Sequence, residues 1–164
     1  MKTLYIIGGP MGVGKTTVGK ELNKMINKCV YLDGDWCWNM NPFIVNDETK
    51  RIVEENICYF LNNFINSSTI NNIIFTWVLH EQDIISKILS NLNCNNIKVI
   101  NISLICNKDD LINRLTKDIS LGLRDESIIN KSLLYLEKYN SLNTIKINTS
   151  NKSIEDIARE IINL

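Results

Sequence analysis

The sequence lacks a surplus of charge of either sign. Its 164 residues contain 18 Lys and Arg and 18 Asp and Glu, so the formal net charge is zero. A protein that binds nucleic acid needs an excess of basic side chains to neutralise the phosphate backbone. We therefore expect no nucleic-acid partner.

Histidine is almost absent, and the cysteines show no metal-binding or disulfide spacing. The chain has a single histidine, His80, and an odd number of cysteines, none of them in a C-x-x-C pair. Zinc sites and disulfide frameworks both require regular sets of such residues. We therefore expect reduced cysteines and no zinc site. The five cysteines are Cys29, Cys37, Cys58, Cys94 and Cys106.

Long apolar runs are also missing. The first apolar stretch breaks at Gly8, which is too short for a signal peptide. No other run approaches the ~20 residues that cross a membrane. We therefore expect a cytoplasmic protein with no membrane partner. Its 45% apolar and 22% charged residues are typical of a globular domain.

Short apolar runs alternate with helical patterns along the whole chain. Between the runs, apolar residues recur at the three- and four-residue spacing of helices with one buried face. The longest of these helices begins near Asp47, the expected N-cap. This alternation predicts an α/β fold, a mainly parallel sheet with helices on both faces, in one domain of residues 1–164. The expected strands cover 4–7, 29–32, 73–78, 99–105 and 144–147.

A glycine-rich motif follows the first expected strand. Residues 9–16, GPMGVGKT, fit the Walker A pattern G-x-x-x-x-G-K-[ST] between a strand and a helix. Glycines let backbone N–H groups turn around the β-phosphate, and a helix N-terminus favours negative charge. Lys15 is predicted to reach the β- and γ-phosphates, and Thr16 to bind Mg²⁺. A turn that binds nothing is the alternative. The predicted phosphate-binding residues are Gly9, Gly12, Val13, Gly14, Lys15, Thr16 and Thr17.

A second motif leaves a GTPase open as an alternative. Residues 107–110, NKDD, fit the guanine-reading pattern N-K-x-D. Asn107 is equally suited to cap a helix whose first turn carries two aspartates. A GTPase also needs a D-x-x-G segment after a strand, and the sequence has none. An ATPase needs a carboxylate at the end of a strand, but the run 73–78 reaches its first acid only at Glu81.

Two carboxylates, Asp33 and Asp35, follow the second expected strand and should face the P-loop. A turn held by an Asx hydrogen bond is the alternative interpretation. With this pair the chain resembles the shikimate kinase and gluconate kinase branch of the adenylate-kinase-like P-loop kinases. The resemblance covers nearly the whole chain and depends on the order of its motifs. These are 9–17, 33–35, 109–114, the polar loop to Arg124, and 148–150.

The resemblance implies a three-layer P-loop NTPase fold with five parallel strands in the order 2-3-1-4-5. It implies ATP and Mg²⁺ as nucleotide and cofactor. Asp33 would help to order Mg²⁺, and Asp35 would hold the acceptor hydroxyl and accept its proton. Residues 116–125 would form a mobile lid that brings Arg124 to the γ-phosphate.

The resemblance also assigns residues around the adenine. Arg114 would flank the adenine or the phosphates, and Thr149 and Ser150 would line the adenine pocket. A solvated charge on the helix surface is the alternative for Arg114.

Aromatic residues follow the Asp pair and the third strand, and they suggest the acceptor. Trp36, Trp77 and His80 are predicted to border a site for a small, unphosphorylated molecule with hydroxyls and an apolar face. A sugar, a nucleoside or an antibiotic has this chemistry. Ordinary core packing is the alternative for the aromatic residues, and a hydrogen-bonded structural histidine is the alternative for His80.

The function predicted is therefore that of an ATP-dependent phosphotransferase, as a monomer or homodimer. A nucleoside monophosphate kinase needs several arginines to grip its acceptor, and Arg51 is the only candidate for an acceptor contact. A regulator that binds ATP without transferring phosphate is a further alternative, because the expected lid has a single arginine.

Overall fold

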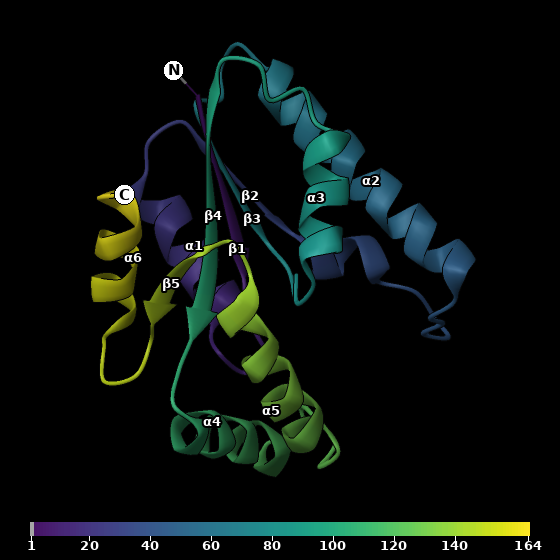
Figure 1. Ribbon diagram of the computed structural model, residues 1–164, viewed down its shortest axis with the longest axis vertical. Helices are drawn as coiled ribbons and strands as arrows, with labels where there is room; N and C mark the ends of the chain where they lie inside the picture. Colours follow the sequence, from purple (N-terminus) through teal and green to yellow (C-terminus); the bar gives the residue numbers. More distant parts are fainter. Residues whose placement is uncertain (1) are drawn as a thin grey trace.

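A five-stranded parallel sheet runs through the centre of the molecule (Figure 1). The computed structural model describes residues 2–164. The strand order is β2-β3-β1-β4-β5, and every neighbouring pair is parallel. The predicted α/β class, sheet order and parallel pairing are confirmed. The strands are β1 (Lys2–Gly8), β2 (Cys29–Asp33), β3 (Asn72–Thr76), β4 (Ile97–Ile105) and β5 (Ile145–Asn148).

Helices cover both faces of the sheet because the strands bury side chains on both sides. Alternate residues of β1 pack into two separate cores, Leu4 and Ile6 into one and Tyr5 and Ile7 into the other. Helices α2 (Asp47–Asn66) and α3 (Gln82–Ser90) pack on the Leu4 side. Helices α1 (Lys15–Met25) and α6 (Ile154–Ile162) pack on the Tyr5 side. The result is the three-layer arrangement visible in Figure 1.

Two further helices lie beyond the carboxyl ends of the strands (Figure 1). They are α4 (Lys108–Ser120) and α5 (Ile128–Lys138). The predicted lid segment, 116–125, therefore begins inside α4. Only its second half belongs to the loop that joins α4 to α5, and the turn at Gly122 has a positive φ of 70°.

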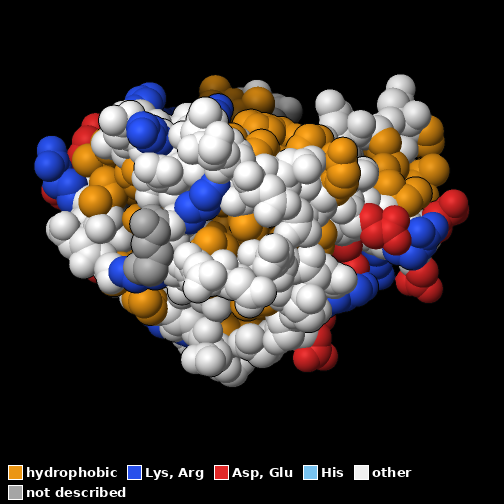
Figure 2. All heavy atoms as spheres, turned by 90° about the horizontal axis from the view of Figure 1, so that it is seen from above, with side chains coloured by type: hydrophobic (Ala, Val, Ile, Leu, Met, Phe, Trp, Pro, Cys, Tyr) orange, Lys and Arg blue, Asp and Glu red, His pale blue; other side chains and the backbone are white. Residues whose placement is uncertain are grey.

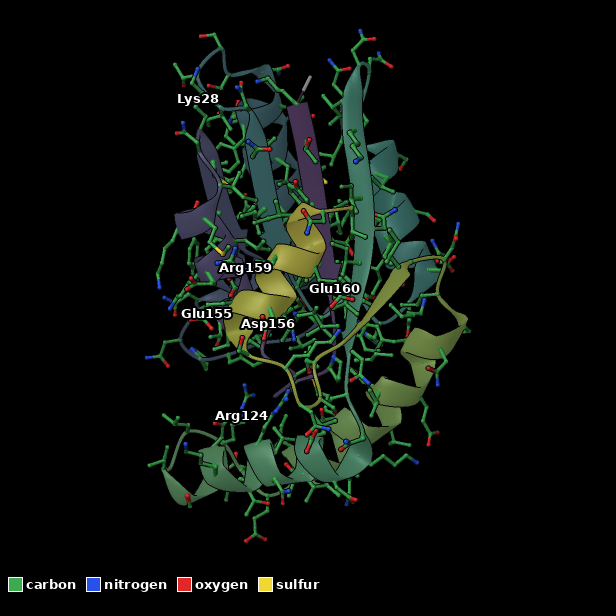
Figure 3. The ribbon with its side chains drawn as sticks, turned by 90° about the vertical axis from the view of Figure 1, so that its left-hand side faces the viewer. Lys28, Arg124, Glu155, Asp156, Arg159 and Glu160 are labelled. Carbon is green, nitrogen blue, oxygen red and sulfur yellow. The ribbon has the colours of Figure 1, made fainter. Side chains whose placement is uncertain are left out.

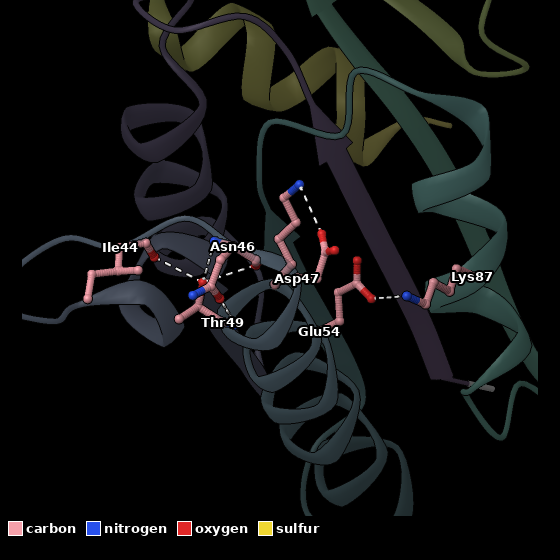
Figure 4. Close-up of polar contacts among 7 residues, drawn as sticks. Ile44, Asn46, Asp47, Thr49, Glu54 and Lys87 are labelled. Carbon is pink, nitrogen blue, oxygen red and sulfur yellow. Dashed lines mark hydrogen bonds and ion pairs between the residues drawn. The ribbon is translucent and has the colours of Figure 1, made fainter.

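The long helix α2 begins at Asp47 and is capped by Asn46, one residue before the expected cap. The side chain of Asn46 accepts a hydrogen bond of 2.8 Å from the Thr49 amide, and the Thr49 hydroxyl accepts one from the Asn46 amide (Figure 4). This capping box satisfies amides that the helix leaves unpaired. The expectation that Asp47 is the cap is therefore wrong by one position, because Asp47 is already helical. An ion pair between Glu54 and Lys87 joins α2 to α3 (Figure 4).

Short 3-10 helices complete the described chain: η1 (Gly34–Trp38) after β2, and η2 (Tyr139–Ser141) before β5. Figure 2 shows the face at the amino ends of the strands, where charged side chains of both signs stand in small groups among uncharged ones. Within residues 2–164, no helix has the length and apolar character needed to cross a membrane.

Candidate functional site

The P-loop forms the turn between β1 and α1. Gly12 and Gly14 have positive φ values of 82° and 105°, which side chains with a Cβ rarely adopt. A Cβ on Gly12 would also lie 2.6 Å from the side chain of Leu115 on α4. These glycines let the loop wrap tightly, and Gly14 brings the chain directly into α1 at Lys15.

A cavity of about 500 Å³ opens beside this loop. It brings together ten of the predicted site residues, which come from the P-loop, η1, α4 and the loops after α4 and β5. These are Gly12, Val13, Gly14, Lys15, Thr16, Thr17, Asp35, Arg114, Arg124 and Thr149. The cavity is also lined by residues that the sequence did not single out as site residues: Met11, Val18, Val78, Lys117, Asp118, Lys152, Ile154 and Ile157.

Lys15 reaches back over the loop that precedes it. Its Nζ donates hydrogen bonds to the carbonyls of Gly9 at 2.8 Å and Pro10 at 2.9 Å. Burial lowers the pKa of Lys15 to about 8, although the nearby carboxylates of Asp35 and Asp33 act in the opposite direction. An added negative charge, such as a phosphate group, would favour the protonated form. The ammonium is therefore positioned to respond to an anion in the cavity. Gly9 contributes its carbonyl to this arrangement without lining the cavity.

Asp33 lies beneath the P-loop and is 5% exposed. Its Oδ2 accepts a hydrogen bond of 2.8 Å from the Thr16 hydroxyl, and its Oδ1 accepts one of 3.1 Å from the Asp35 amide. Hydroxyl and carboxylate oxygens are the hard donors that Mg²⁺ takes, so this pair fits a magnesium ion. No group of three or more His, Cys, Asp and Glu within residues 2–164 is arranged to hold a metal. A magnesium ion here would need water or phosphate oxygens as further ligands.

Asp35 stands in the first turn of η1 and faces the same cavity as Lys15. Burial of the carboxyl group raises its pKa, and the charge of Asp33 raises it further. The charges of Lys15 and Arg124 and a hydrogen bond from Trp77 act in the opposite direction. A carboxylate with a raised pKa is a better proton acceptor at neutral pH than an ordinary aspartate.

Arg114 connects three parts of the site. Its Nη1 donates to the Val13 carbonyl and to the Thr149 hydroxyl, both at 3.0 Å, and its Nη2 donates to the Thr149 carbonyl at 3.1 Å. The guanidinium thereby fixes the P-loop against the loop after β5. Ser150 is turned elsewhere, because its hydroxyl accepts from the Asn107 amide at 3.0 Å and it does not line the cavity.

Arg124 enters the cavity from the loop after α4. Its Nε donates to Asp118 Oδ2 at 3.0 Å, which holds the side chain near the end of α4. In Figure 3 Arg124 lies between α4 and the N-terminal end of α6, where Lys152 and Ile154 line the same cavity. The P-loop, a carboxylate and an arginine thus face one another across one hollow.

With this geometry in place, comparison with known proteins identifies the family. The family described as AAA domain matches residues 6–127. The chain belongs to the AAA domain family. No curated protein sequence matches it.

Solved structures resemble this AAA domain along nearly its whole length. A gluconokinase from Sinorhizobium meliloti 1021 has a TM-score of 0.70 at 15% identity, covering 96% of this chain and 88% of its own. A tunicamycin resistance protein from Deinococcus radiodurans has a TM-score of 0.71 at 16% identity, covering 99% and 95%. A shikimate kinase from Acinetobacter baumannii has a TM-score of 0.64 at 21% identity, covering 99% and 91%. The resemblance inferred from the sequence is confirmed for the fold.

The guanine-reading pattern of this AAA domain is a helix cap. The side chain of Asn107 accepts a hydrogen bond of 2.8 Å from the Asp110 amide, in the first turn of α4. The residues of this pattern do not line the cavity. Their arrangement is the one expected of an N-cap followed by acidic residues near the positive end of the helix dipole.

Aromatic side chains gather beside Asp35, although they do not line the cavity. The Trp77 ring lies directly over Gly34, where a Cβ would come within 2.5 Å of it. Trp38 packs against Trp77 with a ring-centre distance of 6.4 Å. Trp36 lies edge-on to Tyr31 at 5.3 Å and is 56% exposed. Trp36 is therefore the exposed aromatic residue next to Asp35, whereas Trp38 and Trp77 are half-buried against the core that α2 and α3 cover.

Two predicted acceptor residues lie away from the cavity of the AAA domain. Arg51 pairs with Glu55 at 3.0 Å and lines a separate hollow between α2 and α3. His80 stacks on Tyr135 of α5 with a ring-centre distance of 4.0 Å, and its Nε2 is 3.3 Å from Glu81. The structure does not bring Arg51 or His80 to the P-loop.

Proposed function

We propose that this AAA domain is an ATP-dependent phosphotransferase that moves the γ-phosphate to a hydroxyl of a small molecule. The observation that carries the proposal is the shared cavity of Lys15, Arg124 and Asp35. The first two are cations suited to phosphate, and the third is a carboxylate with a raised pKa. The similar structures include a gluconokinase and a shikimate kinase, which agrees with this reaction class.

The phosphates of ATP would lie along the P-loop. Backbone amides of the loop and the N-terminus of α1 would bind the β-phosphate, and Lys15 would neutralise charge on the β- and γ-phosphates. Thr16 and Asp33 would hold Mg²⁺, which withdraws charge from the phosphate oxygens when bound. Arg124 would stabilise the charge that spreads over the γ-phosphate during transfer. The hydrogen bond from Arg124 to Asp118 keeps the guanidinium at the cavity.

The adenine would lie on the side of the cavity formed by α4, the loop after β5 and α6. Ile154 and Ile157 offer apolar contacts there, and Arg114 fixes Thr149 at the edge. We propose ATP in preference to GTP because the cavity contains none of residues 107–110.

Asp35 would act on the acceptor. An acceptor hydroxyl at this carboxylate would attack the γ-phosphorus as the bond from phosphorus to the β,γ-bridging oxygen breaks. The hydroxyl proton passes to Asp35, and ADP leaves with the electron pair of the broken bond. Asp35 would then release the proton to solvent, because the residue as a whole is exposed even though its carboxyl group is partly desolvated at the cavity.

The acceptor would be an unphosphorylated molecule with an apolar face. The exposed Trp36 follows Asp35 directly, and its ring would suit stacking against a ring of the acceptor. Arg51 is engaged with Glu55 in another hollow, so it does not add a cation for an acceptor phosphate.

An ADP-release screen tests this function. Sugars, nucleosides and aminoglycosides are supplied with ATP·Mg²⁺, and nucleoside monophosphates are screened in parallel. We expect an unphosphorylated hydroxyl compound to stimulate ADP release at least ~10-fold over the acceptor-free rate, because a correctly held hydroxyl outcompetes water. Stimulation by nucleoside monophosphates alone would instead favour a nucleoside monophosphate kinase. ATP binding without any stimulation would favour a non-catalytic regulator.

A further inference from the structure

A chain of hydroxyl groups connects strand β3 to the P-loop through Asp33. The Thr76 Oγ1 lies 2.9 Å from the Tyr31 hydroxyl, and the Tyr31 hydroxyl lies 2.9 Å from Asp33 Oδ2. The same Oδ2 receives the Thr16 hydroxyl at 2.8 Å. An ionised carboxylate only accepts hydrogen bonds, so Tyr31 and Thr16 both donate to it. The single hydroxyl proton of Tyr31 is therefore in the bond to Asp33. In the bond between Tyr31 and Thr76, the Thr76 hydroxyl must be the donor and the Tyr31 oxygen the acceptor.

Strand geometry explains why these groups meet. Tyr31 and Asp33 are two residues apart on β2, so their side chains project from the same face of the sheet. Asp33 pairs directly with Thr76 across the parallel register of β2 and β3. Thr76 is fully buried, and Asp33 is 5% exposed. The chain is therefore shielded from solvent at its β3 end.

Packing fixes the ring that carries the central hydroxyl. Gly19 of α1 lies against Tyr31, where a Cβ would come within 2.5 Å of the ring. Trp36 contacts the ring edge-on, with a ring-centre distance of 5.3 Å and an angle of 71°. Tyr31 is thus held by contacts that do not depend on its hydroxyl group.

We propose that Tyr31, supported by Thr76, is a positioning residue that aims the Asp33 carboxylate at Thr16 and hence at the magnesium ion of the bound nucleotide. The inference depends on the nucleotide site of the proposed function. Strand β3 carries no acid at its carboxyl end, and its last residue, Thr76, supplies a hydroxyl in place of one. The acid comes from β2, and β3 orients it through Tyr31.

The chemistry of Thr16 makes this orientation matter. While its proton is donated to Asp33, the Thr16 oxygen keeps its lone pairs directed elsewhere, and a metal ion can bind one of them. Without the Tyr31 hydrogen bond, the Asp33 carboxylate is held only by the Asp35 amide at 3.1 Å and by Thr16 itself, so it fixes the Thr16 hydroxyl less firmly. The defect should appear in the response to Mg²⁺ and leave the binding of phosphate by the P-loop intact.

The test is a nucleotide-binding titration that needs no acceptor. ATP affinity is measured in EDTA and at increasing Mg²⁺ for the wild type and for Tyr31→Phe, which removes the hydroxyl and keeps the ring. We expect affinity in EDTA to stay within ~2-fold and the Mg²⁺ concentration at half-effect to rise about 10-fold, because one hydrogen bond to a charged group is lost. Thr76→Val should move the Mg²⁺ response in the same direction by a smaller factor.

Tyr5→Phe is the matched control. Tyr5 is a buried tyrosine in the same core as Tyr31, on β1, and it lies outside the hydroxyl chain. This variant should leave the Mg²⁺ response unchanged. A Tyr31→Phe variant that behaves like Tyr5→Phe would overturn the proposal, as would equal losses of affinity with and without Mg²⁺.

A double-mutant cycle with Asp33→Asn separates positioning from a general effect on the fold. If Tyr31 acts through Asp33, Tyr31→Phe should have no further effect on the Mg²⁺ response of the Asp33→Asn variant. Additive effects would contradict the inference. Because the cycle uses only ATP and Mg²⁺, its result stands whether or not an acceptor is found. A failed acceptor screen thus bears on the phosphotransferase proposal alone.

Discussion

Arg114 and Val13 are 101 positions apart in the chain, and a hydrogen bond of 3.0 Å joins the guanidinium of one to the carbonyl of the other. The same guanidinium holds both the hydroxyl and the carbonyl of Thr149. Helix α4 therefore fixes the P-loop and the loop after β5 to one another. This arrangement gives the cavity beside the P-loop a preformed wall.

Arg114→Lys should weaken that wall, because an ammonium group cannot make the forked contacts of a guanidinium. Loss of two hydrogen bonds should lower the free energy of unfolding by about 1–3 kcal/mol and weaken ATP binding about 10-fold. Thermal unfolding and calorimetric titration measure the two effects. Arg159→Lys, on the exposed side of α6, is the control. If Arg114→Lys has wild-type stability and ATP affinity, the forked hydrogen bonds of Arg114 are not needed for either.

Asp35→Asn removes the proposed proton acceptor and preserves the shape of the side chain. General-base assistance contributes typically ~10²–10⁴-fold, so kcat with an acceptor should fall by about that factor. ATP affinity should stay near the wild-type value. Asp125→Asn, in the loop before α5, should be silent in the same assay. Wild-type turnover by Asp35→Asn would require another base.

The same carboxyl group should make the stability of the protein depend on pH, and the direction of the change can be stated. The pKa of Asp35 is raised above its ordinary value near 3.8, mainly by burial. The protein is therefore destabilised as the pH rises through the ordinary pKa of aspartate toward the raised one, where Asp35 ionises. Asp35→Asn should be more stable than the wild type at neutral pH and should lose this advantage in acid. Denaturant unfolding at several pH values measures the difference, and an equal stability at every pH would contradict it.

Because of Lys15, we expect ATP binding to take up a proton at alkaline pH. Its pKa is about 8 in the free protein, below its ordinary value of 10.5, because of burial. A bound phosphate group would raise that pKa again. At a pH between these two pKa values, Lys15 is deprotonated in the free protein and protonated in the complex. ATP binding must therefore take up a proton. Calorimetric titration of ATP at pH ~9 in two buffers of different ionisation enthalpy should reveal the uptake.

Lys15→Met should abolish the buffer dependence, and Lys20→Met, on the exposed face of α1, should retain it. Binding enthalpies that are identical in both buffers for the wild type would show that Lys15 does not change its protonation on binding.

The helix cap at α4 predicts that Asp110 has no part in nucleotide selection. Asp110→Ala should leave ATP affinity within ~2-fold, because the Asn107 side chain bonds the backbone amide of residue 110 and not its carboxylate. Asp109→Ala, also in the first turn, should behave alike. GTP binding that is tighter than ATP binding and is lost only in Asp110→Ala would revive the guanine-reading interpretation.

The parts of the site that depend on a short local pattern could be predicted from the sequence. Walker A spacing located the P-loop, and the Asp pair after the second strand located Asp33 and Asp35. Both follow from short segments whose geometry is set by neighbouring residues. The strand order came from the resemblance, and the parallel sheet from the alternation of strands and helices.

The rest of the site depends on how distant helices pack, which no local pattern encodes. Nothing in the sequence around Arg114 indicates that it reaches Val13 and Thr149. Ile154 and Ile157 read only as the buried face of α6, yet they also line the cavity. The sequence leaves His80 open as an acceptor contact, but stacking on Tyr135 of α5 holds it elsewhere. Helix α4 also continues to Ser120, because polar residues there remain compatible with an exposed helix.

Product identification after incubation with γ-labelled ATP, Mg²⁺ and the acceptor selected by the screen tests the central claim most directly. The account predicts a labelled phosphate ester of the acceptor, formed by the wild type, reduced about 10²–10⁴-fold in Asp35→Asn and absent in Lys15→Met. Label found only in inorganic phosphate, or an ester formed equally well by Asp35→Asn, would contradict it.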